Sequence, residues 1–176
     1  MAPQAAAGAA GRRDAADRRP HARDAVRDAD QPPRQLRSLR VADLFAGSGA
    51  LGLEALSRGA AQCLFAENDA AALRALRANV ANLRAQQACD VRAVSVMSLG
   101  PAKEPLDLIL LDPPYQSGAG VVALDRLQRH GWIGEATWVV LETAHNEKVH
   151  VKALAVEAER KVGKAKLSFL RPVVRA

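Results

Sequence analysis

The sequence has few of the residues that mark a secreted, metal-binding or membrane-embedded protein. Its two cysteines, Cys63 and Cys89, are too few for a disulfide framework and have no metal-ligand spacing. The four histidines are scattered along the chain. No apolar run approaches the roughly 18 residues that a membrane span needs, and the arginine-containing N-terminus lacks the apolar stretch of a secretory signal. These absences favour a cytoplasmic protein with no metal ion and no membrane partner.

An excess of one charge is also missing from most of the chain. The formal net charge of +6 is compatible with nucleic-acid binding. However, residues 1–40 hold nine arginines and five aspartates, whereas residues 41–176 hold 16 basic and 14 acidic groups. Because most of the positive excess lies in the first forty residues, charge alone does not identify an RNA partner.

The first 38 residues differ in composition from the rest. They contain eleven alanines, four prolines and no aromatic residue, with Val26 and Leu36 as the only larger aliphatic residues besides Met1. Such a segment buries too little apolar surface to offset an ordering entropy of roughly 1–2 kcal/mol per residue. We therefore predict that residues 1–38 are disordered and that residues 39–176 form one domain.

From Leu39 onward, apolar segments of strand length alternate with segments of helix length. Strands are predicted at residues 39–45, 62–66, 90–96, 106–111 and 137–141, and helices at residues 50–58, 69–84 and 121–129. Residues 151–160 and 164–171 are predicted to form an antiparallel hairpin turned at Gly163. The alternation predicts a doubly wound, mostly parallel Rossmann-like sheet.

A glycine-rich turn follows the first predicted strand. Gly47 and Gly49 stand where open α/β sheets bind ligands, and glycines let backbone amides approach a ligand without an intervening Cβ. Asp43, at the strand end, is expected to direct its carboxylate into the same crevice. Phe45 and Ser48 belong to this predicted binding segment. A tight turn that binds nothing is the alternative interpretation of the segment alone.

Glu67 directly follows the second predicted strand. An acidic side chain there can accept hydrogen bonds from both ribose hydroxyls of an adenosine-containing ligand. Asn68 is expected beside the same ligand, whereas Asp69 is expected to cap the next helix. Taken alone, Glu67 is more readily a solvated loop residue, but the nearby glycine turn reverses this and favours the ribose contact.

The residues Asp112-Pro113-Pro114-Tyr115 follow the fourth predicted strand. The amine of a nucleobase is a poor nucleophile because its lone pair is delocalised into the ring. Asp112 and the carbonyl of Pro113 can accept the two amine hydrogens and so restore that lone pair. Tyr115 can stack on the flat ring and hold the amine in line with a methyl sulfonium. The motif therefore predicts methyl transfer to a planar amine.

Three further residues are weaker candidates for the site. Glu142, after the fifth strand, either lines the substrate side or is a solvated acid at a strand end. Trp132 and Trp138 are expected to pack in the core rather than to stack on a base.

With DLFAGSGALGLEALSRGA at residues 43–60 and LLDPPY at residues 110–115, the chain closely resembles the RsmD family of class I methyltransferases. The resemblance implies transfer from S-adenosylmethionine to the exocyclic N2 of a guanine in 16S ribosomal RNA, within a 30S assembly particle, by a monomeric enzyme. It also implies that Asp43, Gly47 and Gly49 hold the methionine part of the cofactor, Glu67 the ribose, and residues 112–115 the guanine.

The chain departs from the family in two places. Where the family has an Asp or Asn that binds adenine, this chain has Ser95-Val96-Met97, and Met97 is assigned to the cofactor site instead. Before the first strand, the family has an Arg-Pro-Thr-x-Asp-Arg-x-Arg-Glu-x-Leu-Phe motif that is not visible here. Permissible codons for residues 15–38 encode that motif in the +1 frame. We therefore infer that residues 1–38 are an out-of-frame translation and expect little methyl transfer from the chain as written.

Other functions remain open at this point. Asp-Pro-Pro-Tyr serves any planar amine, so methyl transfer to DNA adenine or to another RNA amine is an alternative. A protein glutamine methyltransferase is less favoured because that group prefers Asn at the first motif position. The spacing of Gly47, Gly49, Gly52 and Glu67 also suits an NAD-dependent oxidoreductase, although Asp-Pro-Pro-Tyr has no role in hydride transfer.

Overall fold

The computed structural model describes residues 35–174 as one α/β sheet domain. The predictions for residues 1–34 lie outside the described residues. Residues 35–38 already belong to the domain: Leu36 packs against the buried core, and the Ser38 N–H donates to the Gly59 carbonyl over 3.0 Å. The described domain therefore begins slightly before the predicted boundary at residue 39.

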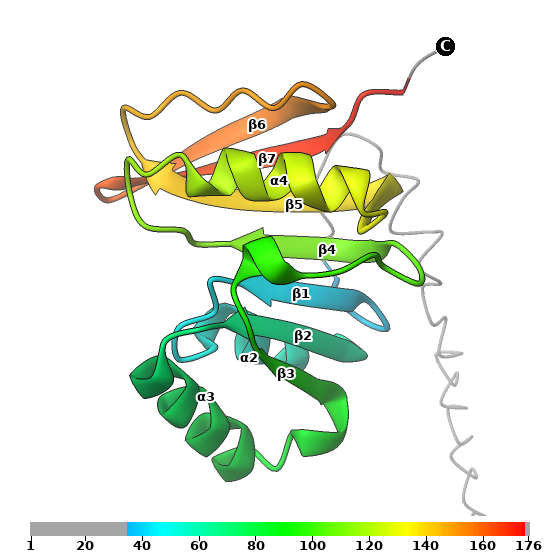
Figure 1. The fold of residues 1–176 in the computed structure, drawn as a ribbon, viewed down its shortest axis with the longest axis vertical. Coiled ribbons are helices and arrows are strands. Elements are labelled where there is room, and N and C mark those ends of the chain that lie inside the picture. The colour runs from blue at the N-terminus through cyan, green and yellow to red at the C-terminus, as the bar shows by residue number, and fades with distance from the viewer. Residues whose placement is uncertain (1–34, 175–176) are drawn as a thin grey trace, which may run out of the picture.

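The strands and helices follow the predicted alternating order (Figure 1). They are β1 (Arg40–Leu44), α2 (Ala50–Ser57), β2 (Gln62–Glu67), α3 (Ala70–Asn82), η1 (Gln86–Ala88), β3 (Cys89–Ala93), η2 (Val96–Ser98), β4 (Leu106–Leu111), α4 (Ala119–Arg129), β5 (Ile133–Ala144), β6 (Leu154–Val162) and β7 (Ala165–Pro172).

The strands form one seven-stranded sheet in the order β3-β2-β1-β4-β5-β7-β6. β1 to β5 are mutually parallel, and β7 is antiparallel to both β5 and β6. The predicted mostly parallel sheet with a C-terminal antiparallel hairpin is thus confirmed. The order reverses between β1 and β4, which is where ligands bind in open α/β sheets.

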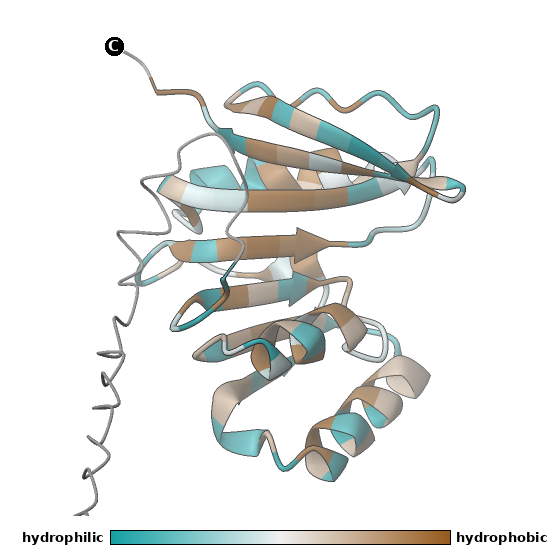
Figure 2. Cartoon of the chain, turned by 180° about the vertical axis from the view of Figure 1, so that it is seen from behind, coloured by the Kyte–Doolittle hydropathy of each residue, from teal (hydrophilic) through white to brown (hydrophobic). Residues whose placement is uncertain are grey.

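The sheet divides the core into two layers. Along β1, Val41 lies in the cluster with α2 and α3, whereas Ala42 and Leu44 lie in the cluster with α4. This division follows from the alternation of side chains along a strand. Figure 2 shows the central strands as mostly hydrophobic ribbons, as expected for parallel strands covered on both faces.

Three strand predictions are wrong in their bounds by three residues or more, the third being β6, which begins at Leu154 rather than at residue 151. β5 runs from Ile133 to Ala144 rather than from residue 137 to 141, because its first residue pairs with Leu106 of β4 and its last residues pair with β7. β3 ends at Ala93 rather than at residue 96, because the Ser95 hydroxyl accepts the Met97 N–H over 3.2 Å and starts η2. Local side chain–backbone bonds of this kind compete with strand pairing.

Candidate functional site

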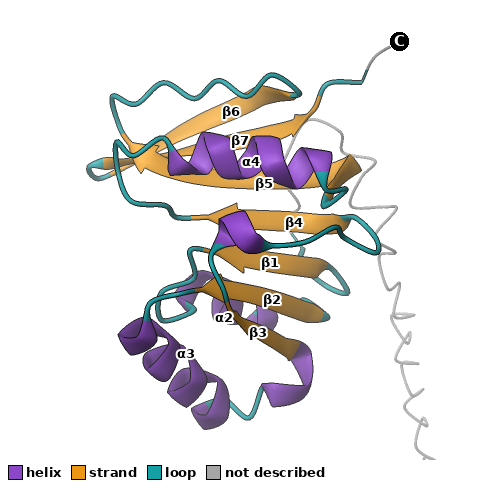
Figure 3. Cartoon of the chain, in the orientation of Figure 1, coloured by secondary structure: helices purple, strands orange, loops and turns teal. Residues whose placement is uncertain are grey.

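The ends of β1, β2, β4 and β5, with the loops that follow them, lie on one side of the sheet, which we call the carboxyl edge. Figure 3 shows these loops gathered beyond the strand arrowheads. All residues assigned to the site from the sequence are on these strand ends and loops or, for Met97, in η2 just after β3. The topology therefore brings together segments that are far apart in the chain.

The two glycines of the first turn have different structural roles. Gly47 has a φ of +56° and open space where a Cβ would stand. Gly49 has a φ of +83°, and an added Cβ would lie 2.2 Å from Leu76 Cδ1 on α3. Gly47 is thus the position where a ligand can approach the backbone, whereas Gly49 lets α3 pack closely on the start of α2.

Phe45 and Ser48 complete this turn. Phe45 has a φ of +59°, which for a non-glycine residue costs about 1–3 kcal/mol. Its half-buried ring packs against the core cluster that contains α4. Ser48 is exposed, and its carbonyl accepts the Asn79 side-chain amide over 3.0 Å. The turn is therefore anchored on both sides.

Asp43 is buried, with 1% of its surface exposed. Its carboxylate accepts the Gly52 N–H over 2.8 Å, inside the first turn of α2. Burial raises the pKa of Asp43 from 3.8 to about 7, partly countered by the Gly52 bond and increased by the negative charges of Asp112 and Glu67. Asp43 thus holds the glycine turn in place through its hydrogen bond to the start of α2.

Glu67 is held by three backbone N–H groups. Its Oε2 accepts the Gly47 N–H, and its Oε1 accepts the N–H groups of Asn68 and Asp69, each over 2.8 Å. A carboxylate offers about four acceptor positions, so one remains for a ligand hydroxyl. Asn68 is exposed, and Asp69 accepts the Ala72 N–H as the predicted helix cap.

The Asp112–Tyr115 segment continues β4 toward the end of β1. The Asp112 N–H donates to the Leu44 carbonyl over 3.4 Å. Pro113 is buried and packs on Gly120 of α4, where an added Cβ would lie 2.6 Å from Leu141 Cδ1 and 3.1 Å from Pro113 Cγ. The close packing of α4 therefore fixes the backbone of this segment.

The carbonyl groups of the two prolines differ in availability. The Pro114 carbonyl accepts the Ser117 hydroxyl over 2.6 Å. The Pro113 carbonyl has no hydrogen-bond partner among residues 35–174. Pro113 thus keeps a free carbonyl acceptor, which its predicted role in binding the amine requires.

Glu142 joins the site from the neighbouring strand β5. The Tyr115 hydroxyl donates to Glu142 Oε1 over 2.9 Å, and this bond raises the pKa of Tyr115. The pKa of Asp112 is raised mainly by partial burial and to a smaller extent by the negative charge of Glu142. Glu142 therefore contacts the predicted motif through Tyr115, and its place on the substrate side stays a prediction.

Some neighbours of the motif were not found from the sequence. Gln116 has a φ of +55°, and its N–H donates to Glu147 Oε2 over 3.2 Å. No local pattern announces this contact, because Glu147 lies in the loop after β5. Trp132 and Trp138 are 7% and 3% exposed, which confirms their expected place in the core.

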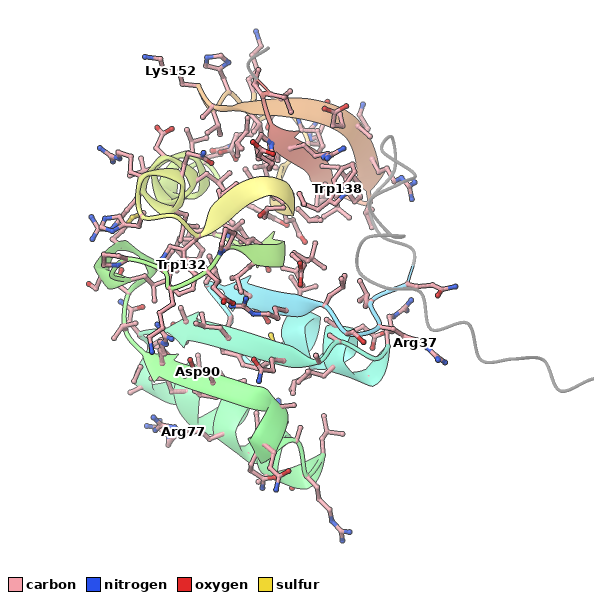
Figure 4. All side chains as sticks on the ribbon, turned by 90° about the vertical axis from the view of Figure 1, so that its right-hand side faces the viewer. Arg37, Arg77, Asp90, Trp132, Trp138 and Lys152 are labelled. Carbon is pink, nitrogen blue, oxygen red and sulfur yellow. The ribbon has the colours of Figure 1, made fainter. Side chains whose placement is uncertain are left out.

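The opposite side of the sheet, formed by the starts of β1 to β5 and called here the amino edge, faces the reader in Figure 4. A cavity of about 420 Å³ lies there, between residues that include Arg40, Asp90 and Trp132. Its arginines are neutralised: Arg40 pairs with Glu104 over 2.6 Å, and Arg92 pairs with Asp90 over 2.8 Å. None of the predicted site residues lines this cavity.

Neither a membrane-spanning helix nor a metal site is found in the described part of the chain. No helix there is long and apolar enough to cross a membrane. No group of three His, Cys, Asp or Glu side chains within residues 35–174 could hold a metal ion.

The sequence is similar to ribosomal RNA methyltransferases over part of their length. The family model described as Conserved hypothetical protein 95 matches residues 14–171. The protein named Ribosomal RNA small subunit methyltransferase D from Escherichia coli K12 is 37% identical to this chain over 57% of its length. The protein of the same name from Haemophilus influenzae is 32% identical over 57% of this chain. The matches cover 51% and 54% of those proteins, so the chain spans about half the length of these relatives.

Solved structures share the fold. The Escherichia coli protein yhhF superposes with a TM-score of 0.71 at 30% identity, covering 78% of each chain. The O-methyltransferase NcsB1 from neocarzinostatin biosynthesis, solved with S-adenosylmethionine, has a TM-score of 0.60 at 14% identity, over 77% of this chain and 49% of that one. The fold is that of the class I S-adenosylmethionine-dependent methyltransferases, as predicted.

Proposed function

The chain belongs to the RsmD family, to which the Conserved hypothetical protein 95 model corresponds, and we propose that it methylates the exocyclic N2 of a guanine in 16S ribosomal RNA. One observation carries the proposal: Asp112, Tyr115 and Glu142 converge at the ends of two adjacent strands, next to the glycine turn and Glu67. The residues proposed to bind the target base and those proposed to bind the cofactor are thus neighbours at one edge of the sheet.

The turn after β1 fits S-adenosylmethionine. When bound, this cofactor supplies an electrophilic methyl group on a sulfonium. The open backbone at Gly47 suits its methionine part, and the remaining acceptor position of Glu67 suits a ribose hydroxyl. Met97 and Phe45 are half-buried apolar side chains that can contact the adenine, while Asp43 holds the turn. The clustered carboxylates also favour a cationic ligand.

The residues after β4 activate and position the amine. Asp112 and the Pro113 carbonyl accept its two hydrogens and return the lone pair to nitrogen. Tyr115 is 51% exposed, so its ring is available to stack on a base. Its bond to Glu142 fixes the ring orientation, which contributes to catalysis by positioning.

The pair of carboxylates favours guanine over adenine. The Watson–Crick edge of guanine presents N1–H and N2–H donors side by side, whereas that of adenine presents an N1 acceptor beside its amine. Asp112 and Glu142 offer two neighbouring acceptors that match guanine, and they repel the N1 lone pair of adenine.

The proposed partner is 16S ribosomal RNA within a 30S assembly particle, modified in the cytoplasm by a monomer. The test is label transfer from S-adenosylmethionine to small-subunit particles, naked 16S RNA and DNA, followed by nucleoside analysis. We expect N2-methylguanosine from particles or RNA, more of it from a frame-restored chain than from the chain as written, and its loss in Asp112→Asn. Label found in DNA alone would contradict the proposal.

The proposal that residues 1–38 are an out-of-frame translation is independent of the proposal for the site. The family match begins at residue 14 and therefore includes part of that segment. The nucleotide sequence of codons 1–45 tests it directly. If the +1 frame does not encode the Arg-Pro-Thr motif, the idea fails. If it does, a frame-restored chain should transfer methyl groups faster than the chain as written.

A further inference from the structure

The positive charge of the described domain is concentrated in its C-terminal part. Residues 35–144 contain ten Lys and Arg against eleven Asp and Glu, a net charge of −1. Residues 145–166 contain six Lys and Arg against three Glu, a net charge of +3. The excess therefore comes from the loop after β5 and the hairpin of β6 and β7, outside the cofactor turn and the acceptor motif.

Part of this charge lies at the carboxyl edge, beside the acceptor motif. β7 is antiparallel to β5, so its first residues pair with the last residues of β5, Thr143 with Lys166 and Glu142 with Leu167. The His145 N–H donates to the Lys164 carbonyl over 3.2 Å. Lys166 Nζ donates over 2.8 Å to the carbonyl of Glu147, whose carboxylate accepts the Gln116 N–H.

The turn between β6 and β7 holds its lysines in a fixed place. We call Lys161, Val162, Gly163 and Lys164 the hairpin tip. Val162 pairs with Ala165, which leaves a two-residue loop with Gly163 first at a φ of +60°, as in a type II′ turn. Figure 1 shows this turn projecting beside the arrowhead of β5. A short turn of this kind keeps the flanking side chains close to one geometry.

The lysines at the hairpin tip lack counter-charges. Lys161 is directly opposite Lys166 across the strands, an arrangement of like charges that destabilises a sheet. Lys166 is neutralised by Glu159 over 2.9 Å. Lys161 and Lys164 are exposed and have no ion-pair partner among the described residues. Lys161 and Lys164 are therefore available to an external anion.

We propose that the hairpin tip binds the phosphate backbone of the RNA strand that carries the target base. The proposal rests on the proposed function, because it assigns the tip to the substrate of the neighbouring Asp112–Tyr115 motif. A strand whose base stacks on Tyr115 would carry its flanking phosphates across the end of β5 toward Lys161 and Lys164. Phosphate contacts of this kind position a nucleic acid without reading its sequence.

Salt dependence of RNA binding tests the tip. A fluorescein-labelled single-stranded RNA is titrated with the full chain and anisotropy is followed at several salt concentrations. The variant Lys161→Ala/Lys164→Ala should reduce the slope of log Kd against log salt by about 1.4, or 0.7 for each lost contact. Its Kd at low salt should rise roughly tenfold.

Lys152→Ala is the matched control. Lys152 is also an exposed lysine of the same loop-and-hairpin region, but it lies at the amino edge, beside Glu135 and Pro172 (Figure 4). Its variant should keep the wild-type slope. Equal effects of the tip and control variants, or no effect of either, would overturn the proposal. So would a chain that binds phosphatidylserine vesicles but not RNA, if the tip variant loses the vesicle binding.

The outcome can be separated from that of the proposed function. The tip variant should raise KM for RNA in methyl transfer, while kcat and the Kd for S-adenosylmethionine stay unchanged. Tip-dependent RNA binding without any methyl transfer would contradict the proposed function and leave the tip assignment supported. Methyl transfer that the tip variant does not affect would contradict the tip assignment alone.

Discussion

On the β1–β2 half of the carboxyl edge, the carboxylates of Asp43 and Glu67 accept four backbone N–H groups between them. On the β4–β5 half, Asp112 accepts no hydrogen bond within residues 35–174, and Glu142 accepts one from Tyr115. In the first half the carboxylates mainly hold a turn through backbone hydrogen bonds. In the second half the acceptors stay available for a substrate.

The difference also appears in burial. Asp43 is buried, whereas Tyr115 is half-exposed. A rigid turn suits a cofactor of constant shape, and an open set of acceptors suits a base that must enter from a larger molecule. Substitutions in the two halves should therefore produce separable defects.

The largest effect is expected for Asp112→Asn. Loss of the carboxylate removes the charged acceptor for the amine hydrogen, so methyl transfer should fall by about 10²–10³-fold. Because the cofactor turn is untouched, the Kd for S-adenosylmethionine should change less than about threefold, as measured by calorimetry. Asp125→Asn, an exposed residue of α4, is the control. Equal losses of activity and cofactor affinity would break the separation.

Substituting the two glycines should separate folding from binding. Gly49→Ala places a Cβ 2.2 Å from Leu76 at an unfavourable φ, so its unfolding free energy in urea should fall by about 2–4 kcal/mol. Gly47→Ala meets open space and should cost only about 1 kcal/mol through its φ, yet weaken cofactor binding. The reverse order of stabilities would contradict the assigned roles.

The sequence predicts a glycine turn at Gly47 and Gly49, but not that one glycine is open to a ligand while the other is needed for packing. The order of strands and helices, the parallel sheet and the helix cap at Asp69 follow from local patterns. The close approach of Leu76 to Gly49 depends on how α3 packs, and the Tyr115–Glu142 bond depends on β4 and β5 being neighbours. Both are long-range contacts that no local pattern specifies. The same holds for β5, whose extra length is set by β7.

A smaller effect is expected from the pH dependence of stability at Asp43. Folded Asp43 keeps its proton up to about pH 7, while unfolded Asp43 loses it near 3.8, so this residue favours unfolding increasingly as pH rises through that interval. Asp43→Asn should therefore be more stable than the wild type at pH 8, by an amount on the order of 1–3 kcal/mol. The difference should shrink toward pH 4 in thermal unfolding curves. A difference independent of pH would contradict this account.

The smallest effect is expected for Glu142→Gln. Removing this charge lowers the pKa of Asp112, so the acidic limb of the kcat/KM profile should move to lower pH. The rate at pH 8 should fall less than about tenfold, because the Asp112 acceptor itself is unchanged. Discrimination against adenine should weaken as well, measured with RNAs that carry either base. An unchanged acidic limb would show that the two carboxylates do not interact.

The most direct test of the site follows the nucleoside formed by the chain, and by its frame-restored form, from labelled S-adenosylmethionine and 16S RNA or small-subunit particles. The account predicts label in N2-methylguanosine, at one position, and none after Asp112→Asn. Label in adenine, in DNA alone, or in guanine at an undiminished rate after that substitution would contradict it.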